Sequence, residues 1–370
     1  MMVNKCFLLC ISLMIIFGGN VTLSAQTDDI VRLAYLKSDE NGVAQIFITD
    51  PNNLESRQQI TDVSGGVSDF DISTDGQFIA YSARDDRQMV ADIYLLELAT
   101  NEVRKLTDCS ASSDSCFNPV FSPLGDKIAF VYQDTPSIAL ETTLIYIWLI
   151  DLTENTVAPL SDDEPIFGIK PVWSPDGEHL AFFDLADSNV TVYTFADESF
   201  RFFPSAIPED IIFSPDATQI AYLAMIYDED VHNAPYTEIW LTTIADGTRH
   251  PVGRTDPNHR NGFMAWRPNS TQIALSQGYL ENGDETFGRQ IYLYDTQTNI
   301  LSPLVVNKQY ESHFFTWDMT GEYLAMQRWQ VLGNNGLSIS GPLLEVWIYE
   351  MSTARLIKID DDARNPQWLP

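Results

Sequence analysis

The sequence has 370 residues, with 21 basic and 52 acidic side chains and a formal net charge of −31 at pH 7. A field of this sign repels the phosphates of nucleic acids and anionic membrane surfaces, so we expect neither as a partner. The length suits two domains of average size, but one large all-β ring can also reach it, so internal repeats must decide between them.

The first 25 residues have the pattern of a secretory signal peptide. Lys5 stands in a short polar start, residues 7–17 form an apolar run, and small residues surround Ser24 and Ala25. The run is shorter than the roughly 20 residues that a membrane-spanning helix needs. We therefore expect cleavage near Ala25, export to the periplasm or the extracellular space, and no membrane insertion of the mature chain. An uncleaved anchor is the alternative.

Two cysteines, Cys109 and Cys116, would remain in the mature chain, because Cys6 and Cys10 lie in the signal peptide. In an oxidising compartment their spacing within a polar stretch favours a disulfide that closes a short loop. A metal or redox pair is the alternative, but such pairs usually have two intervening residues and further ligands nearby.

From residue 31 onward the sequence repeats. A large apolar residue followed by a turn sequence, as in Trp173-Ser-Pro-Asp-Gly, recurs at intervals of 40 to 53 residues. This interval is typical of the four-stranded blades of a β-propeller. We call the apolar residue of each repeat the anchor; the anchors are Ile72, Phe121, Trp173, Phe213, Trp266, Trp317 and Trp368.

Two further marks recur with the anchors. An alanine that follows Ile or Leu occurs at Ala34, Ala80, Ala129, Ala181, Ala221, Ala274 and Ala325. An aromatic residue inside a strand-like run comes next, at Phe47, Tyr94, Trp148, Tyr193, Trp240, Tyr292 and Trp347. The short apolar runs and their Asp-Gly, Asn-Ser or Thr-Gly junctions favour strands and tight hairpins. The recurrent alanine indicates a place where neighbouring blades leave no room for a larger side chain.

The two ends of the repeat region complement each other. Ala34 has no anchor before it, and Trp368 has no alanine after it. We therefore predict one all-β domain at residues 26–370, a seven-bladed β-propeller of four-stranded antiparallel blades in which the C-terminal strand completes the N-terminal blade. Six or eight blades are the alternatives. Ring closure removes exposed sheet edges, and we expect a monomer.

These repeats resemble the WD40-like, or PD40, propeller repeats of the TolB-type family. The resemblance rests on the aromatic-Ser-Pro-Asp-Gly turn, the Leu-Ala-Phe and Ile-Tyr strands and a closing Leu106-Thr107, and it extends from about Val31 to Pro370. It implies a propeller but no single activity, because such repeats build the Tol-Pal periplasmic protein, the propellers of prolyl-oligopeptidase-like and tricorn-like peptidases, and some pectin-fragment lyases.

The resemblance also limits the expected function. TolB has an additional N-terminal domain, whereas here the repeats begin within about six residues of the predicted cleavage point. The peptidases add an α/β-hydrolase domain, for which the sequence shows no Gly-x-Ser-x-Gly elbow. We therefore expect neither a Tol-type role nor peptidase activity.

No familiar catalytic, zinc or phosphate-loop motif occurs in the sequence. We expect Asp176 and its equivalents Asp75 and Asp216 to bond the backbone of their own turns. The histidines show no metal-ligand spacing, so we expect no metal and no cofactor; convergence of three of them from separate blades would instead support a polysaccharide lyase. They are His179, His232, His250, His259 and His313.

Two acidic runs, Asp228-Glu229-Asp230 and Asp360-Asp361-Asp362, lack the spacing and the central glycine of an EF-hand loop. We interpret both as solvated loops, which leaves weak calcium binding open.

Loop lengths favour one face of the ring. In each blade the loop after the second strand and the crossing to the next blade share a face, here called the long-loop face. The spacing from alanine to aromatic is 18 to 22 residues in the fifth to seventh blades and 19 in the third, against 12 to 14 elsewhere. We therefore expect long neighbouring loops at 226–237, 278–289 and 329–344, with the Cys109 to Cys116 loop on the same face.

These loops contain side chains suited to binding, because a rigid ring can hold aromatic and polar groups in fixed positions. The candidates are Tyr227, Asp230, His232, Tyr236, Tyr279, Glu281, Phe287 and Trp329. The alternative is that the loops are insertions whose aromatic residues only pin them down.

The sequence thus predicts an exported, non-catalytic binding or scaffold propeller that recognises a protein, a peptide or an envelope glycan through its long-loop face. A propeller-type polysaccharide lyase or hydrolase is the alternative function. A purely structural repeat used in surface assembly is a third.

Overall fold

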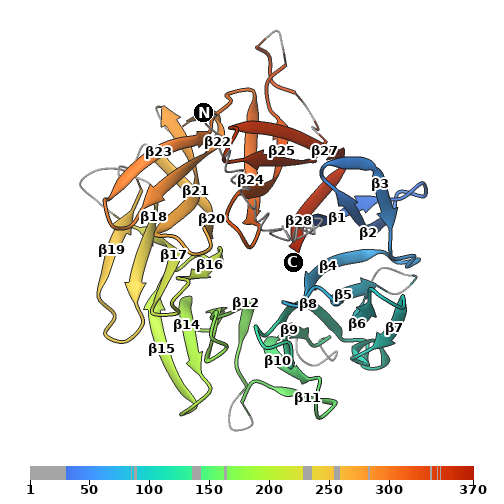
Figure 1. Ribbon diagram of the computed structural model, residues 1–370. Coiled ribbons are helices and arrows are strands. Elements are labelled where there is room, and N and C mark those ends of the chain that lie inside the picture. The colour runs from blue at the N-terminus through green and yellow to red at the C-terminus, as the bar shows by residue number, and fades with distance from the viewer. Residues whose placement is uncertain are drawn as a thin grey trace, which may run out of the picture. The chain divides into compact units, whose positions relative to one another are not determined.

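The computed structural model describes residues 31–370, apart from residues 85, 87–89, 136–142, 162–164, 228–235, 254–258, 282–283, 334–335, 340 and 342, and without the side chains of residues 280–287. The predicted signal peptide lies outside the described residues. Residues 31–370 form seven four-stranded antiparallel sheets arranged in a ring (Figure 1). In the described part, the one helical segment is a 3-10 turn at Cys109–Ser112, and no helix has the length and apolar character needed to cross a bilayer.

The strands of each blade run from the axis outwards. Blade 1 consists of β28 (Ala363–Leu369), β1 (Arg32–Ser38), β2 (Ala44–Asp50) and β3 (Asn53–Gln59). Blade 2 consists of β4 (Val67–Ile72), β5 (Phe78–Arg84), β6 (Ala91–Glu97) and β7 (Glu102–Lys105). Blade 3 consists of β8 (Ser115–Phe121), β9 (Lys127–Gln133), β10 (Ile145–Asp151) and β11 (Thr156–Pro159). Blade 4 consists of β12 (Gly168–Trp173), β13 (His179–Asp184), β14 (Asn189–Thr194) and β15 (Ser199–Pro204).

The last three blades follow the same order. Blade 5 consists of β16 (Ile211–Phe213), β17 (Gln219–Ile226), β18 (Tyr236–Thr243) and β19 (Arg249–Val252). Blade 6 consists of β20 (His259–Trp266), β21 (Gln272–Glu281), β22 (Asp284–Asp295) and β23 (Ile300–Val305). Blade 7 consists of β24 (Tyr310–Trp317), β25 (Tyr323–Gln330), β26 (Glu345–Glu350) and β27 (Arg355–Asp361).

The predicted seven-bladed architecture is confirmed. Each anchor lies at or next to the end of an innermost strand, each recurrent alanine lies on a second strand, and each recurrent aromatic lies on a third strand. All seven alanines are 0% exposed, in agreement with close packing between blades. The ring closes as expected, because Leu33 of β1 pairs with Trp368 of β28.

The turn aspartates cap their own hairpins, as predicted. Asp75, Asp176 and Asp216 each accept a hydrogen bond from the backbone N–H two residues later, at 3.0, 3.0 and 3.2 Å. Each also accepts one from a serine hydroxyl two residues earlier. These carboxylates therefore have a structural role in the turns.

Anchor tryptophans join neighbouring blades. The indole N–H of Trp173 donates to the carbonyl of Val120, that of Trp317 to Ala265, and that of Trp368 to Thr316, at 3.1, 3.3 and 3.1 Å. Each acceptor directly precedes the anchor of the previous blade. A buried indole N–H needs such a partner, and here it gives each tryptophan a fixed position between two innermost strands.

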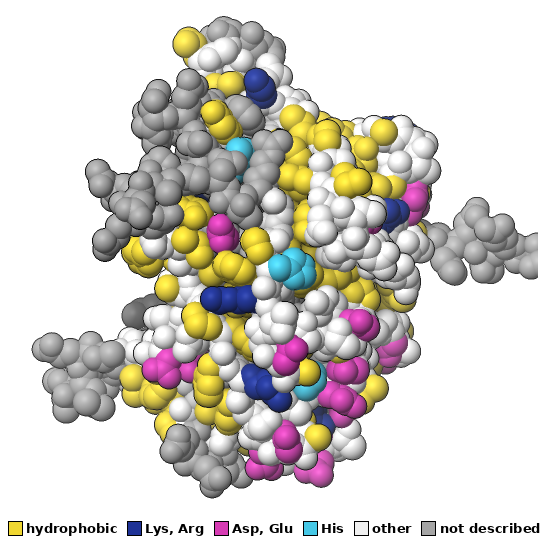
Figure 2. Space-filling model, turned by 90° about the vertical axis from the view of Figure 1, so that its left-hand side faces the viewer, with side chains coloured by type: hydrophobic (Ala, Val, Ile, Leu, Met, Phe, Trp, Pro, Cys, Tyr) yellow, Lys and Arg dark blue, Asp and Glu magenta, His cyan; other side chains and the backbone are white. Residues whose placement is uncertain are grey.

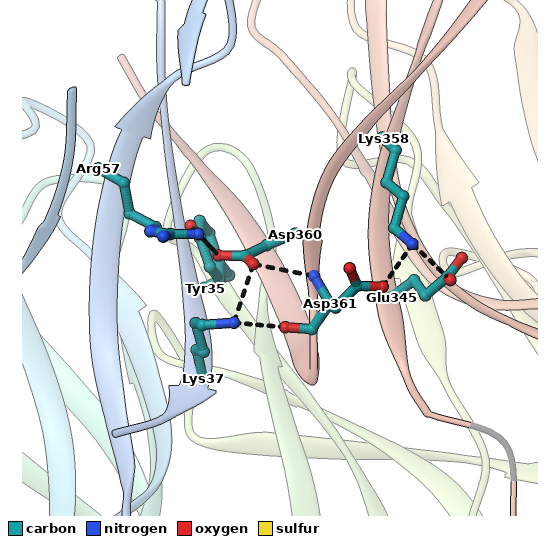
Figure 3. Close-up of polar contacts among 7 residues, drawn as sticks. All are labelled: Tyr35, Lys37, Arg57, Glu345, Lys358, Asp360 and Asp361. Carbon is teal, nitrogen blue, oxygen red and sulfur yellow. Dashed lines mark hydrogen bonds and ion pairs between the residues drawn. The ribbon is translucent and has the colours of Figure 1, made fainter. Parts of the chain in front are cut away.

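Blade 7 is also joined to blade 1 by a buried carboxylate (Figure 3). Asp360 of β27 accepts hydrogen bonds from Tyr35 of β1 at 2.9 Å, from Lys37 of β1 at 2.8 Å and from Arg57 of β3 at 2.7 Å. Its side chain is only 7% exposed. The interpretation of this acidic run as a solvated loop is therefore wrong for Asp360, because strand β27 continues to Asp361 and carries this carboxylate into the blade interface.

The predicted disulfide is present between Cys109 and Cys116. Both cysteines are buried, and they close the segment that links β7 of blade 2 to β8 of blade 3. The buried carboxylate of Asp92 accepts the backbone N–H of Cys109 at 2.6 Å. The segment is therefore fixed by both a covalent bond and a hydrogen bond, and as a crossing between blades it belongs to the long-loop face.

Acidic side chains of β4 hold blade 3 near the axis. Asp69 accepts the backbone N–H of Asn118, and Asp71 accepts that of Phe121, both at 2.7 Å. Burial raises the pKa of Asp71 to about 6. Charging Asp71 therefore opposes folding at neutral pH.

Replacement of Asp71 by Asn should flatten the pH dependence of stability. The folded protein binds this proton more tightly than the unfolded chain does, so the free energy of unfolding falls as pH rises from about 4 to about 6. We expect D71N to equal the wild type near pH 4 and to exceed it at pH 7.5 by at most about 3 kcal/mol. Denaturant titrations across this range measure the difference, and D62N, at an exposed position, serves as the control. A D71N difference that does not vary with pH contradicts the prediction.

Candidate functional site

The three expected long segments lie on the long-loop face, but one is not a loop. In blade 5, β17 ends at Ile226 and β18 begins at Tyr236; in blade 7, β25 ends at Gln330 and β26 begins at Glu345. In blade 6, β21 continues to Glu281 and β22 begins at Asp284, so the predicted loop 278–289 is an extended hairpin. The aromatic and aliphatic residues of this segment favour strand pairing beyond the ordinary length of a blade.

The candidate residues fall into three groups. Tyr227 is 72% exposed just after β17, Tyr236 is half-buried at the start of β18, and Tyr279 of β21 is 38% exposed. Trp329 is half-buried on β25. Asp230 and His232 lie outside the described residues, as do the side chains of Glu281 and Phe287.

Two of these aromatic residues contact histidines of the innermost strands. Tyr279 lies edge-on to His259, with 5.5 Å between ring centroids. Trp329 stacks on His313 at 4.4 Å with an interplanar angle of 22°. Phe263 of β20 in turn contacts the edge of His313 at 5.0 Å, so the rings of blades 6 and 7 touch near the axis.

Charged groups complete what we call the His313 cluster, formed by Phe263, Arg289, Glu311, His313 and Trp329. The Arg289 guanidinium lies 3.4 Å from Nδ1 of His313, and Nε2 of His313 is hydrogen-bonded to Glu311. Because arginine can only donate, Nδ1 accepts and Nε2–H donates to the carboxylate. Burial opposes ionisation of Glu311, but the His313 hydrogen bond and the nearby charges of Arg289 and Arg260 outweigh it and lower the pKa of Glu311.

Two glycines make room for this cluster. A Cβ atom on Gly288 would lie 2.4 Å from Cβ of Glu311, and one on Gly262 would lie 2.8 Å from Oγ of Ser276. Both contacts are too short for any other residue. In the described part of the chain, Oγ of Ser276 and Nε of Arg289 are buried without a hydrogen-bond partner. The cluster thus has unused donor capacity, which is costly unless something else satisfies it.

An ion pair from the neighbouring blades also acts on the cluster. Lys170 of β12 lies 3.3 Å from Asp210, which directly precedes β16, and 3.6 Å from Glu209. Burial raises the pKa of Asp210, whereas the charge of Lys170 and, when the ring is protonated, that of His313 lower it. Charged groups of blades 4, 5, 6 and 7 therefore influence one another around the axis.

Blade 7 also contains a buried cation that makes no ion pair with any residue the structure describes. Arg328 of β25 is 2% exposed, and its guanidinium lies over the rings of Tyr310 and Trp347 at 4.2 and 5.2 Å from their centroids. Burial lowers the pKa of Arg328 to about 10. Aromatic faces thus replace a carboxylate as its partners.

The residues that lie near the axis on the innermost strands have a signal in the sequence, which loop lengths do not show. Three positions before each anchor stand Asp69, Asn118, Lys170, Asp210, Phe263, Phe314 and Asn365. Asn118, Lys170, Phe314 and Asn365 adopt positive φ at irregularities of strand pairing. A count backwards from the anchors would have identified these positions as a set.

The described histidines do not converge on one point. Within the described residues, the one group of side chains with metal-ligand geometry is Asp176, Glu178 and His179. Asp176 already caps its turn, and Nδ1 of His179 lies 3.0 Å from the Thr194 hydroxyl. This group lies at a tight turn rather than on the long-loop face, and it does not match the three-histidine site of the lyase alternative.

The outer side of the ring carries scattered exposed apolar side chains, unlike the residues gathered near the axis. Figure 2 shows hydrophobic side chains spread over this side and acidic ones gathered in the lower part of the view. Outer strands carry isolated exposed apolar residues such as Phe202 of β15 and Ile300 of β23. Scattered residues of this kind are normal on a protein surface.

Comparisons with known proteins agree with the fold. No family model matches the chain. Dipeptidyl-peptidase 5 of Aspergillus fumigatus is 26% identical over 129 residues, which are 31% of this chain and 18% of that protein. Probable dipeptidyl-peptidase 5 of Aspergillus niger is 24% identical over 177 residues, 45% of this chain and 23% of that protein. The chain thus spans less than a quarter of the length of these relatives.

Solved structures extend the likeness to nearly the whole ring. A puromycin-hydrolyzing peptidase of Mycobacterium tuberculosis superposes with a TM-score of 0.65 at 14% identity, over 92% of this chain and 55% of the peptidase. The propeller domain of the Trilobed protease from Pyrococcus furiosus superposes with a TM-score of 0.59 at 13% identity, over 89% of this chain and 92% of that domain. TolB from Acinetobacter baumannii superposes with a TM-score of 0.50 at 15% identity, over 92% of this chain and 67% of TolB. The chain shares the propeller fold of TolB and of these peptidases.

Proposed function

We propose that this chain is an exported binding propeller whose long-loop face, over blades 5 to 7, holds a peptide, a protein segment or an envelope glycan. The observation that carries the proposal is the combination of exposed Tyr227 and Tyr279 with the His313 cluster on one face of a rigid ring. Aromatic rings offer flat apolar faces, and fixed charged groups beside them orient a polar ligand.

Other observations support parts of this proposal. A disulfide persists in oxidising compartments, which favours export. Pairing with β28 covers the inner edge of β1, which favours a monomer. The acidic net charge favours a ligand other than nucleic acid.

The test is replacement of Tyr236, Tyr279 and Trp329 by Ala in one variant. Arrays of peptides and of bacterial envelope glycans are screened with the wild-type protein, and each probe retained is titrated by calorimetry. Loss of stacking surface should weaken binding at least tenfold, since each aromatic contact contributes about 1 kcal/mol or more. Phe202→Ala, at an exposed aromatic residue on an outer strand, is the matched control.

Two outcomes count against a binding role on this face. If the triple variant retains the affinity of the wild type while both unfold at the same temperature, the ligand binds elsewhere. If mass spectrometry shows that a retained glycan is cleaved, the alternative function as a polysaccharide lyase or hydrolase is favoured.

A further inference from the structure

A second polar site lies on the long-loop face, between blades 1 and 2. It is a pocket of about 230 Å³, lined by the turn between β1 and β2, by the crossing from β3 to β4, and by side chains from β5 and β28. The lining side chains and backbone that matter here belong to Ser38, Gly65, Gly66, Ser68, Arg84 and Arg364. Among the residues that the structure describes, no aspartate or glutamate lines the pocket.

The two arginines are available for a ligand. Arg84 ends β5 and is exposed, whereas Arg364 is half-buried in β28. In the part of the chain that the structure describes, neither guanidinium makes a hydrogen bond or an ion pair with another side chain. Five lysines of the described part each pair with a carboxylate: Lys37, Lys105, Lys127, Lys170 and Lys358.

An arginine without a carboxylate partner is not rare in the described part of the chain, since Arg328 is another. What distinguishes Arg84 and Arg364 is that both line one pocket with no carboxylate among its described lining residues, in a chain with 52 acidic and 21 basic side chains. A guanidinium presents several N–H donors in a planar fork, which matches the oxygens of a carboxylate, a sulfate or a phosphate.

Acidic groups near the pocket are directed to other partners. Asp69, next to Ser68, accepts hydrogen bonds from the hydroxyl of Ser82 and the backbone N–H of Asn118, both at 2.7 Å. Burial raises the pKa of Asp69, and the charge of Arg84 only partly offsets this effect. Asp86 is hydrogen-bonded to the Ser64 hydroxyl and does not line the pocket. The pocket therefore keeps a positive lining.

The pocket is held in shape without a ligand. Gly66 has a φ of +84°, and a Cβ atom there would lie 3.1 Å from Cγ1 of Val43, so the crossing from β3 to β4 packs against the β1–β2 turn. Asp39 fixes that turn by accepting the backbone N–H groups of Asn41 and Val43 at 2.8 and 2.9 Å. A preformed site of this kind loses little entropy on binding.

We propose that this pocket binds an oxyanion group, a carboxylate, sulfate or phosphate, carried by a peptide or a glycan that lies on the long-loop face. Arg364 and Arg84 hold the anion, and Ser38 supplies a further hydroxyl donor, whereas the Ser68 hydroxyl is hydrogen-bonded to Asp69. The volume exceeds that of a few water molecules, so part of the residue or sugar that carries the anion also fits. The site is separate from the His313 cluster and does not depend on it.

Calorimetric titration with paired probes tests the site. The carboxylate probes are trigalacturonate and N-acetyl-triglycine; their neutral partners are the trigalacturonate methyl ester and the N-acetyl-triglycine amide. Sodium sulfate and inorganic phosphate are the remaining arms. The proteins compared are the wild type, the double variant Arg84→Gln and Arg364→Gln, and Arg355→Gln, which removes an exposed arginine of blade 7.

We expect at least one anionic probe to bind the wild type with millimolar or better affinity and its neutral partner not to bind. The double variant should bind that probe at least tenfold more weakly, whereas Arg355→Gln should bind it as the wild type does. The probe that binds shows whether the natural group is a carboxylate, a sulfate or a phosphate. The proposal is overturned if no anionic probe binds at 10 mM, or if the double variant, folded as judged by its unfolding temperature, binds as the wild type does. The variant that lacks Tyr236, Tyr279 and Trp329 should bind these small probes as the wild type does. Failure of the binding role proposed for blades 5 to 7 is therefore distinguishable from failure of this anion site.

Discussion

Removal of residues 363–370 is expected to open the ring and to abolish cooperative unfolding. These residues include all of β28, which pairs with β1 and carries the buried side chains of Trp368 and Leu369. Loss of two large buried side chains alone costs roughly 5–10 kcal/mol, which equals the whole stability of many domains. The truncation also exposes the edge of β1 and the faces of blades 2 and 7. Limited proteolysis and thermal unfolding should show a chain that is degraded rapidly and melts without a sharp transition.

Removal of Pro370 alone is the matched control, because this residue is exposed and lies outside β28. We expect its unfolding temperature to stay within about 3 °C of that of the full chain, as is usual for changes at exposed positions. If the chain that lacks residues 363–370 resists protease as well as the control does, β28 is not needed for closure.

Replacement of Asp360 by Asn should strongly destabilise the ring junction. The carboxylate receives Tyr35, Lys37 and Arg57 in a nearly buried setting, and its loss leaves two cations without their counter-charge. Breaking a buried pair from one side costs about 3–5 kcal/mol, and the partial exposure of Arg57 places this case at the lower end, about 3 kcal/mol. Denaturant unfolding at pH 7 measures the loss.

The pH dependence distinguishes a charge effect from a packing effect. Burial alone would raise the pKa of Asp360, but hydrogen bonds from Lys37, Tyr35 and Arg57 lower it below the usual value. The stabilisation is therefore complete above about pH 4 and is lost as pH falls through the lowered pKa. The gap between wild type and D360N should narrow below pH 4. Asp361→Asn, at a side chain that is 61% exposed, should cost less than about 1 kcal/mol; an equal loss in both variants contradicts this account.

The blade arrangement was predictable because it depends on local patterns that repeat. An anchor such as Trp173, its turn aspartate and the later Ala181 occupy fixed spacings, and the same spacing recurs wherever a blade is built. The position of Trp368 at the end of the chain predicted which strands would pair. The spacing of the repeat and the pairing of its strands can therefore be predicted from local sequence, without knowledge of how the blades pack.

The junction and the axis were not predictable in this way. Asp360 stands among three aspartates and looks solvated, and its donors Tyr35 and Lys37 lie more than 300 residues away in sequence. The His313 cluster gathers single residues from different strands, with no motif in any one of them. Such contacts arise from blade packing, which depends on the geometry of the whole ring.

The meeting of both ends of the chain in blade 1 has a consequence for how the protein is made. Strand β1 is among the first parts of the ring to be synthesised, yet it stays unpaired on its inner side until β28 has been produced. The contacts with the widest sequence separation are then the last to form, which slows folding of the complete ring. If the protein is exported as proposed above, this delay has a use, because a chain whose ring closes last can cross a membrane unfolded.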